Sequence, residues 1–599
     1  MSNRSCLVRL KSPVETYHRY KFVPEKHKQE LIGIINDLNA LEEYNEKKLG
    51  QVLKKYPKNG NQTYSKSEII QGFRAFSEEF SWNEAHFFDR LRMKPIRTAS
   101  GVAPVTVLTK PYPCPGKCIF CPNDVRMPKS YLSMEPGAQR ATQNAFDPYA
   151  QTMSRLKAFH FNGHRLNKVE LIILGGTWSS YPRSYQIWFV KRCFDAMNDF
   201  TGKEAFGRPD VELDMDFLDL NDTFHGDKIE QSYNEIVSDY LKEKLDGKLL
   251  HQIESASYES LEEAQQKNIM SKHRCVGLVI ETRPDEISEA ELVHIRKLGG
   301  TKIQIGIQSL NDEILELNKR GHTVERTRKA IALIREAGFK IHAHWMPNLY
   351  GATVKSDIDE FGDMFGDQDF RPDELKVYPC SLIESAELMT KYRDGSWQPY
   401  SFDDLVDIME GVLPQVPEYC RVTRVIRDIP SHDIVVGNKL SNFRELATKR
   451  LQDQENALRD IRSREIRTDK VHADDLTCDE IVYETSIGME HFLQFVTKEN
   501  RIVGFLRLSL PKEPVFLDEI SNHAMIRELH VYGPVVQFGS TGDTKPQHVG
   551  LGTKLIERSV KIARDAGFKT LSVISAIGTK GYYSKQGFED GPLYMHRTL

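Results

Sequence analysis

The 599-residue sequence holds few cysteines and no long hydrophobic run. Nine cysteines are too few for a disulfide scaffold, so they fit a reducing compartment, in which clustered thiols indicate a metal or catalysis. No apolar run approaches the ~18 residues that span a bilayer, and the N-terminus lacks the apolar core of a signal peptide. The sequence therefore predicts a soluble, cytoplasmic protein with no membrane contact.

The net charge is small, −4 at pH 7, but it is unevenly distributed. Residues 1–100 hold 18 Lys and Arg against 12 Asp and Glu, a difference of +6. Residues 201–250 hold 6 against 13, a difference of −7. A basic N-terminal part can face phosphates, although a solvated helical surface explains the same charge equally well.

The pattern of apolar residues divides the chain into four regions. Helical spacing predicts a helical, basic region over residues 1–95, whose charge makes it a candidate for binding phosphates. Residues 96–400 alternate between strand-like and helical stretches, interrupted by the acidic, strand-poor segment 201–250, which we interpret as an insertion. Residues 401–470 are expected to connect this part, through a charged helix, to a small α/β domain over residues 471–599.

The alternation in residues 96–400 predicts βα units and a parallel sheet that is closed or partly closed. The carboxyl ends of such strands share one face, where chemistry gathers. The basic stretch MKPIRTASGVAP, residues 93–104, is expected to be a loop. The expected strands are Val169–Leu174, Val276–Glu281, Lys302–Gln308, Lys340–Trp345 and Glu374–Tyr378.

The motif CPGKCIFCP contains Cys114, Cys118 and Cys121. Three thiolates within eight residues can bind one iron–sulfur cluster and leave its fourth iron open. An open iron can bind the amino and carboxylate groups of S-adenosylmethionine. Zinc is the alternative, but zinc prefers four ligands, and only His160 and His164 follow nearby.

A second motif begins at Gln547, where QHVGLGT opens an amphipathic helix. Backbone N–H groups at a glycine loop and a helix N-terminus bind anions such as pyrophosphate. Further on, Tyr582 or Tyr583 can orient a thioester or protonate its leaving thiolate, or both rings simply pack a helix. Adjacent helical residues face different ways, so one of the two is expected to reach a ligand. Glu528 is a candidate base or the end of a strand.

Taken together, these features resemble a radical S-adenosylmethionine (radical SAM) barrel fused to a GCN5-related (GNAT) acetyltransferase. From about residue 90 onward the chain resembles the elongator complex protein 3 family. The segments that carry the resemblance are KPIRTASGVAPV, CIFCP, LGGTW, IETRPD, IQIGIQS, KRGHT, AGFKIHAHWMPNL, FRPDELKVYP, RVIRDIP, NFRELA, ELHVYG, QHVGLG and GTKGYYSKQGF. The resemblance implies an α/β fold: a partial (βα) TIM-like barrel followed by a GNAT domain, with a helical N-terminal region.

The resemblance also implies an activity, the synthesis of 5-carboxymethyluridine at the wobble position of tRNA. The expected cofactors are a 4Fe-4S cluster and S-adenosylmethionine, with acetyl-CoA as substrate. A 5′-deoxyadenosyl radical would take hydrogen from the acetyl methyl group, the carbon radical would add to uracil C5, and thioester hydrolysis would follow. Expected partners are a tRNA anticodon stem-loop, a second copy of the chain, or other Elongator subunits. The alternatives are a protein lysine acetyltransferase with a structural barrel, or a non-catalytic RNA-binding scaffold.

Residue roles follow from the matched segments. The implied cluster ligands are Cys114, Cys118 and Cys121, and the implied S-adenosylmethionine contacts are Gly175, Gly176, Glu281 and Gln308. Lys168, Tyr582 and Tyr583 are the implied catalytic residues of the acetyl-CoA site. The implied coenzyme contacts are Lys168, Glu528, Leu529, His530, Val531, Gln547, Gly550, Leu551, Gly552, Thr553 and Tyr583. The candidate RNA contacts are Lys94, Arg97, Arg320 and His322.

The sequence departs from the family pattern at two places. Thr177 stands where the superfamily usually has an acid, and Leu458 replaces a cysteine of eukaryotic members. An accessory zinc would then need other ligands, for which Cys380, Cys420 and His432 are candidates.

Overall fold

The computed structural model describes residues 22–81, 84–98, 100–202, 232–244, 254–439, 443–453, 458–466, 471–532, 535–536 and 550–599. Among them no helix is long and apolar enough to cross a membrane. Gln547 and most of the acidic segment 201–250 lie outside the described residues.

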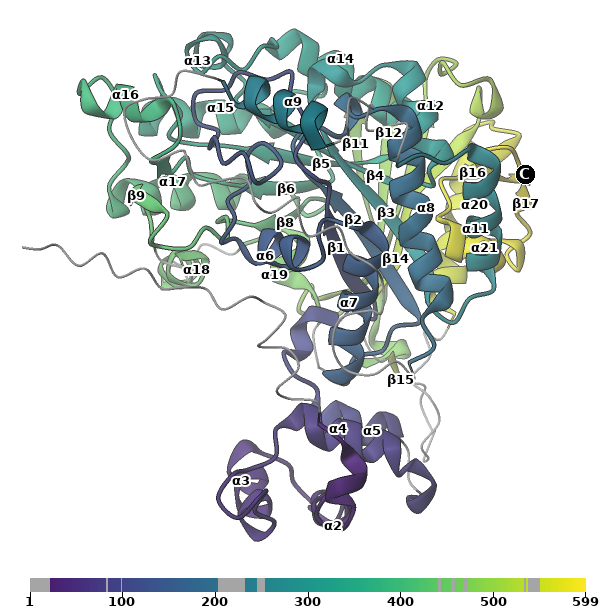
Figure 1. The fold of residues 1–599 in the computed structure, drawn as a ribbon. Coiled ribbons are helices and arrows are strands. Elements are labelled where there is room, and N and C mark those ends of the chain that lie inside the picture. Colours follow the sequence, from purple (N-terminus) through teal and green to yellow (C-terminus); the bar gives the residue numbers. More distant parts are fainter. Residues whose placement is uncertain are drawn as a thin grey trace, which may run out of the picture.

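The N-terminal helices form a small core of their own. A capping box between Ser65 and Glu68 starts α4, and Leu31, Ile34 and Ile69 are fully buried between the helices. Figure 1 places this group, in purple, at the foot of the molecule. Its helices are α2 (Lys28–Asn39), α3 (Glu46–Lys55), α4 (Lys66–Ala75) and α5 (Glu84–Leu91).

The middle of the chain forms seven parallel strands in the order β1-β2-β3-β4-β5-β6-β8, which confirms the predicted partial barrel. The first strand overlaps residues that we had expected in a loop, because Ala103 and Pro104 pair with β2. The strands are β1 (Ala103–Leu108), β2 (Lys168–Leu174), β3 (Arg274–Thr282), β4 (Lys302–Gln308), β5 (Lys340–Trp345), β6 (Glu374–Val377) and β8 (Arg421–Arg424).

Helices surround this sheet and its loops (Figure 1). They are α6 (Pro136–Gln143), α7 (Pro148–Phe161), α8 (Arg183–Asp199), α9 (Tyr233–Lys244), α11 (Tyr258–Ile269), α12 (Glu289–Lys297), α13 (Asp312–Leu317), α14 (Val324–Glu336), α15 (Val354–Gly366), α16 (Leu388–Arg393) and α17 (Phe402–Val412). A short ribbon pairs β7 (Leu382–Ile383) with β9 (Ile434–Val436). The expected single connecting helix is instead two, α18 (Phe443–Asp453) and α19 (Ile461–Arg464).

The C-terminal domain is a second seven-stranded sheet, ordered β11-β12-β13-β14-β16-β18-β17. Its central strand β14 pairs in parallel with β16 only from Ala524 to Ile526, so beyond that point the backbone of β14 is open on one side. The elements are β11 (Thr477–Thr485), β12 (Gly488–Val496), β13 (Ile502–Pro511), β14 (Ala524–Val531), α20 (Leu551–Asp565), β16 (Thr570–Val573), α21 (Lys580–Ser584), β17 (Glu589–Asp590) and β18 (Met595–Thr598). Beside it, β10 (Val471–His472) pairs with β15 (Val535–Val536).

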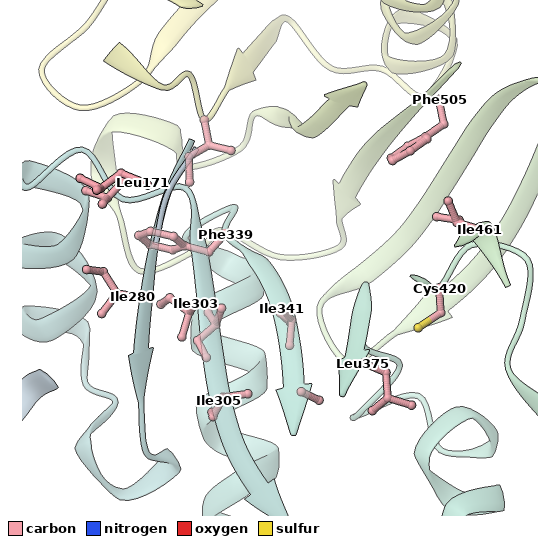
Figure 2. Packing of buried hydrophobic residues seen from close by; sticks show 14 of the residues in the cluster. Leu171, Ile280, Ile303, Ile305, Phe339, Ile341, Leu375, Cys420, Ile461 and Phe505 are labelled. Atoms are coloured by element: carbon pink, nitrogen blue, oxygen red, sulfur yellow. The ribbon is translucent and has the colours of Figure 1, made fainter. Parts of the chain in front are cut away.

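The barrel and the C-terminal domain share one hydrophobic core. Figure 2 shows part of it, with Ile303 and Ile341 from barrel strands and Phe505 from β13 in the same cluster. The two parts also approach closely at Gly578, where an added Cβ would lie 2.6 Å from the Cβ of Arg274 on β3. The C-terminal domain therefore closes the end of the barrel at which the strands begin.

Buried ion pairs reinforce this contact. Arg527 of β14 donates two hydrogen bonds, of 2.6 and 2.9 Å, to the carboxylate of Asp373, which precedes β6. Arg507 of β13 lies 3.5 Å from the same carboxylate. All three side chains are essentially inaccessible to solvent. Burial alone would raise the pKa of Asp373, but Arg527, Arg507 and Arg335 lower it to about 2, so the group stays ionised.

Replacing Asp373 by Asn is expected to destabilise the protein by about 3–5 kcal/mol, because it leaves buried guanidinium groups without their counter-ion. Asp359→Asn, which removes an exposed pair with Lys355, should change stability by less than about 1 kcal/mol. Urea unfolding followed by tryptophan fluorescence measures both. Equal midpoints for the two variants would contradict the role given to Asp373.

Candidate functional site

A cavity of about 1940 Å³ runs through the barrel. Barrel interiors are usually filled by Val, Ile and Leu, but here the inward positions of the middle strands are polar or charged. The cavity reaches from the cysteine loop at the carboxyl ends of the strands to Tyr532, just after β14 of the C-terminal domain. The polar side chains along it are Glu170, Lys302, Gln304, His342, His344, Glu374, Lys376 and Arg421.

The three motif cysteines all line this cavity. The Cys114 Sγ lies 3.4 Å from Thr177 Oγ1. The Cys118 Sγ accepts hydrogen bonds from Arg320 Nη1 at 3.5 Å and from Arg283 Nη1 at 3.7 Å. A hydrogen bond from the Cys121 thiol and the two guanidinium charges hold the pKa of Cys118 well below its usual value, against the effect of burial. The surroundings of Cys118 therefore favour its thiolate form.

The segment that we interpreted as an insertion supports this loop. Its described helix, α9, packs Tyr233, Val237 and Leu241 against a core that includes Leu108 of β1. Asn234 of α9 accepts a hydrogen bond from the Cys114 N–H at 2.9 Å and donates one to the Cys114 carbonyl at 2.8 Å. No motif in the sequence indicates this contact, because the two residues are far apart in the chain.

The donor set fits an iron–sulfur cluster better than a single ion. No group of three or more His, Cys, Asp or Glu side chains in the described part of the chain is placed to hold one metal ion. Thiolates of a 4Fe-4S cluster bind different irons, so they need not meet at a point. His164, a candidate for zinc, bonds Thr98 instead. The accessory zinc candidates do not converge either, since Cys420 lies in the hydrophobic core and His432 is exposed.

The segment LGGTW ends β2 in a tight approach to β1. Gly175 has φ +136° and Gly176 has φ +53°. A Cβ on Gly175 would lie 2.0 Å from Thr109 Oγ1, so only glycine fits. Gly176 and Thr177 face the cavity beside the cysteines.

Glu281 and Gln308 also line this end of the cavity. Glu281 Oε2 accepts a hydrogen bond from the Tyr131 hydroxyl at 2.9 Å, and its Oε1 lies 3.5 Å from His344 Nδ1. Gln308 has φ +67°, and its buried Oε1 has no hydrogen-bond partner within the described structure. Buried polar atoms are nearly always paired, so this oxygen is a fitting contact for a ligand. The structure thus brings all the implied cluster and S-adenosylmethionine residues together.

Two of the four candidate RNA contacts are exposed and two are buried. Arg97 is exposed and lines the cavity, and Lys94 is exposed in a smaller pocket beside α4. Arg320 and His322 are 5% and 8% exposed. Arg320 bonds the Cys118 thiol and the Gly306 carbonyl, so it serves the cysteine loop and lies away from the surface on which an RNA contact was expected.

Sequence reasoning missed two arginines that join Arg97. Arg140 of α6 and Arg155 of α7 line the same part of the cavity. Burial, together with the charges of Arg140 and Arg97, lowers the pKa of Arg155 to about 9. None of the three pairs with an acidic side chain in the described residues. Since Arg97 is exposed, this arginine group (Arg97, Arg140 and Arg155) lies where the cavity meets solvent, and it is an unneutralised site for anions.

The acetyl-CoA candidates gather at the N-terminus of α20. Gly550 caps this helix with φ +62°. A Cβ on Gly552 would lie 2.5 Å from the Tyr582 hydroxyl and 3.7 Å from Leu529. Tyr583 is instead buried and packs on Phe588. Of the two tyrosines, Tyr582 is therefore the one at the helix N-terminus.

The strand β14 connects this helix end to the barrel cavity. Leu529 lies at Gly552, His530 packs on Tyr532 with ring centroids 4.3 Å apart, and Val531 pairs with Gly504. Tyr532 itself lines the cavity. The two candidate sites are thus joined through four consecutive residues.

Two further candidates lie at the contact between the domains. Glu528 bonds Lys340 and Arg507, each at 2.9 Å. Although burial opposes them, these cations lower the pKa of Glu528 to about 2, which makes the carboxylate a weak base. Lys168 begins β2 beside Arg274, and burial lowers the pKa of Lys168. It lies at the barrel end that the C-terminal domain covers, outside the large cavity.

Comparison with known proteins gives a consistent result. Family models for the radical SAM superfamily and the radical SAM C-terminal domain match residues 251–361 and 372–453. The chain is 37% identical over 530 residues to the tRNA uridine(34) acetyltransferase of Methanocaldococcus infernus, covering 85% of this chain and 88% of that protein. It is 32% identical to Elongator complex protein 3 of Saccharomyces cerevisiae, with 86% of each chain covered. The solved structure of archaeal Elp3 from M. infernus, lacking its N-terminus, matches with a TM-score of 0.64 at 33% identity, covering 84% of this chain and all of that one.

The close approach at Gly175 can be tested with a matched control. Gly175→Ala is expected to destabilise the cavity wall by about 1–3 kcal/mol or more, since it adds backbone strain and a clash with Thr109. Gly395→Ala also has positive φ, +79°, but meets nothing within 4 Å, so it isolates the strain. Thermal unfolding compares the two variants. A Gly175→Ala protein as stable as Gly395→Ala would contradict the close approach.

Proposed function

Because the chain belongs to the elongator complex protein 3 family, we propose that it forms 5-carboxymethyluridine at the wobble position of cytoplasmic tRNA. S-adenosylmethionine would be the radical source and acetyl-CoA the donor of the two-carbon group. The names of the relatives support tRNA wobble uridine as the target, and the radical SAM models support the chemistry.

The observation that carries this proposal is the continuity of the cavity. One space of about 1940 Å³ touches Cys114, Cys118 and Cys121 at one end and Tyr532 of the C-terminal domain at the other. A reaction between a radical, an acetyl group and a base needs all three in one chamber with little water. A protein acetyltransferase with an inert barrel would need no such connection.

Different residues along this chamber would bind the cluster, S-adenosylmethionine and the coenzyme. The three thiols would hold a 4Fe-4S cluster, whose electron would cleave S-adenosylmethionine and start the radical reaction. Gly175, Gly176, Glu281 and Gln308 would bind S-adenosylmethionine beside the cluster. The backbone N–H groups at the start of α20 would bind the coenzyme pyrophosphate, and the Tyr582 hydroxyl would orient the pantetheine arm.

The arginine group would bind phosphates of the anticodon stem-loop where the cavity opens. Single-stranded RNA bases that are splayed out of a loop are typical targets of sequence-specific recognition. Three guanidinium groups at the opening, without an acidic partner among the described residues, fit the backbone on either side of such a base, because phosphate contacts set register and orientation.

RNA binding tests the arginine group. Replacing Arg97, Arg140 and Arg155 singly by Gln is expected to weaken stem-loop binding and to lower the slope of log K against log salt by about 0.7–1 for each lost contact. Arg564→Gln, at an exposed site on α20, is the control. Binding isotherms at several salt concentrations provide the measurement. An unchanged slope in all three variants would remove the arginine group from the RNA site.

Anaerobic reconstitution tests the reaction itself. With S-adenosylmethionine, acetyl-CoA and an anticodon stem-loop, the wild-type chain is expected to release 5′-deoxyadenosine and to add a carboxymethyl group to uridine. The Cys118→Ala protein is expected to do neither, since the cluster loses a ligand. Mass spectrometry of the RNA and chromatography of the nucleosides measure both. Acetylated peptide without modified RNA would favour the protein acetyltransferase, and equal turnover by the Cys118→Ala protein would exclude the cluster.

A further inference from the structure

Lys376 occupies the middle of the chamber. It lies on β6 opposite His344 of β5 and lines the cavity. Its ammonium group donates one hydrogen bond, to Gln304 Oε1 at 2.6 Å. No carboxylate of the described residues lies within ion-pair distance, 4.0 Å, of its Nζ.

Lys302, the neighbouring lysine on β4, has acidic partners and a purely structural role. Lys302 Nζ lies 3.0 Å from Glu170 and 3.0 Å from Glu374, so its charge is neutralised inside the protein. Lys376 is only partly buried, at the cavity wall, and its hydrogen-bond partner is a neutral amide. Burying an ammonium group without a counter-ion is costly. A site that keeps such a group beside a cavity is suited to a ligand that accepts hydrogen bonds.

Tyr378, the residue directly after β6, indicates what kind of ligand this is. The ring of Tyr378 lies 5.9 Å from Lys376 Nζ and also lines the cavity. An aromatic face beside a hydrogen-bond donor is how proteins hold a splayed base, by stacking and by contact with the base edge. A lysine can only donate. Its ammonium group can therefore donate to the C4 carbonyl oxygen of uracil. It cannot pair with the amino group that cytosine carries at C4, because that group is also a donor.

We propose that Lys376 contacts the acceptor base, with its ammonium group donating a hydrogen bond to the C4 carbonyl oxygen of uracil while Tyr378 stacks on the ring. This inference rests on the function proposed above and assigns one specificity-determining residue to it. The contact would hold C5, next to C4, towards the reacting acetyl carbon, and it would exclude cytidine.

The protonation of Lys376 gives this contact a pH dependence. Burial, which outweighs the attraction of nearby carboxylates, lowers the pKa of Lys376 to about 8. The ammonium donor is therefore present when the pH is well below 8 and is lost as the pH rises through that value. The groups that face Lys376 from the surrounding strands are Glu281, Glu374, Lys302, Arg424, His342, His344 and Tyr378.

The test uses the full-length, reconstituted chain with stem-loops that carry uridine or cytidine at the target position. Lys376→Met is expected to lower modified uridine by about 100-fold, the usual effect of deleting one buried donor to a reacting group. Release of 5′-deoxyadenosine and the KM for acetyl-CoA should stay within about 2-fold of wild type, because neither cofactor site is altered. Lys355→Met, at an exposed lysine of α15, is the matched control.

Lys376→Arg covers the case in which the methionine variant fails to fold. It keeps a donor whose pKa is far above 8, so its rate of uridine modification should no longer fall between pH 7.5 and about 9, as the wild-type rate does. Modification by Lys376→Met within about 2-fold of wild type would overturn the inference. So would a parallel loss of acetyl-CoA binding, which would assign Lys376 to the thioester carbonyl. A wild-type chain that leaves uridine unmodified would instead overturn the proposed function.

Discussion

The pairing of Asp373 with Arg527 is the interaction on which the rest of the structure depends. A barrel whose interior is lined by Lys, His, Gln and Glu side chains has no apolar plug of its own. Its stability must come from the helices around it and from whatever closes its open end. The C-terminal sheet provides that closure, and Asp373 with Arg527 and Arg507 fixes its position with charges that burial makes expensive to separate. The C-terminal sheet is therefore the lid of the chamber, and the chamber exists because this lid is attached.

The lid also determines which groups meet. The strand β14 that supplies Arg527 to the ion pair continues through Leu529, at the N-terminus of α20, to Tyr532 in the chamber wall. The proposed coenzyme site and the chamber therefore cannot move apart without breaking a continuous strand. Glu528, in the same strand, bonds Lys340 of the barrel, so its carboxylate serves this attachment. These ion pairs explain why the pKa of Glu528 is far below that of a catalytic base.

The sequence was informative wherever a signal was local. The barrel strands β4 and β5 begin and end as predicted, since apolar residues alternate with polar ones along each of them between turn signals. The cysteine motif could also be recognised from the sequence, because its three thiols lie close together in the chain. Contacts between distant segments left no such signal. Arg140 and Arg155 join Arg97 only in space, and Arg320 reads as a surface charge although it bonds the thiol of Cys118. The choice between Tyr582 and Tyr583 likewise depends on how α21 is oriented against α20.

Two lysines that line the chamber, Lys302 and Lys376, differ in their partners. Lys302 is paired with Glu170 and Glu374, and together they form a layer of ion pairs at the end where the lid is attached. One layer closer to the cysteines, Lys376 has no such match, and Gln308 beyond it has an unpaired buried oxygen. Next to the lid the charged side chains are thus paired with one another, and towards the cysteine loop fewer of the cavity-lining groups have such a partner among the described residues. Such a gradient is expected of a chamber whose lower end is structural and whose upper end is completed by bound molecules.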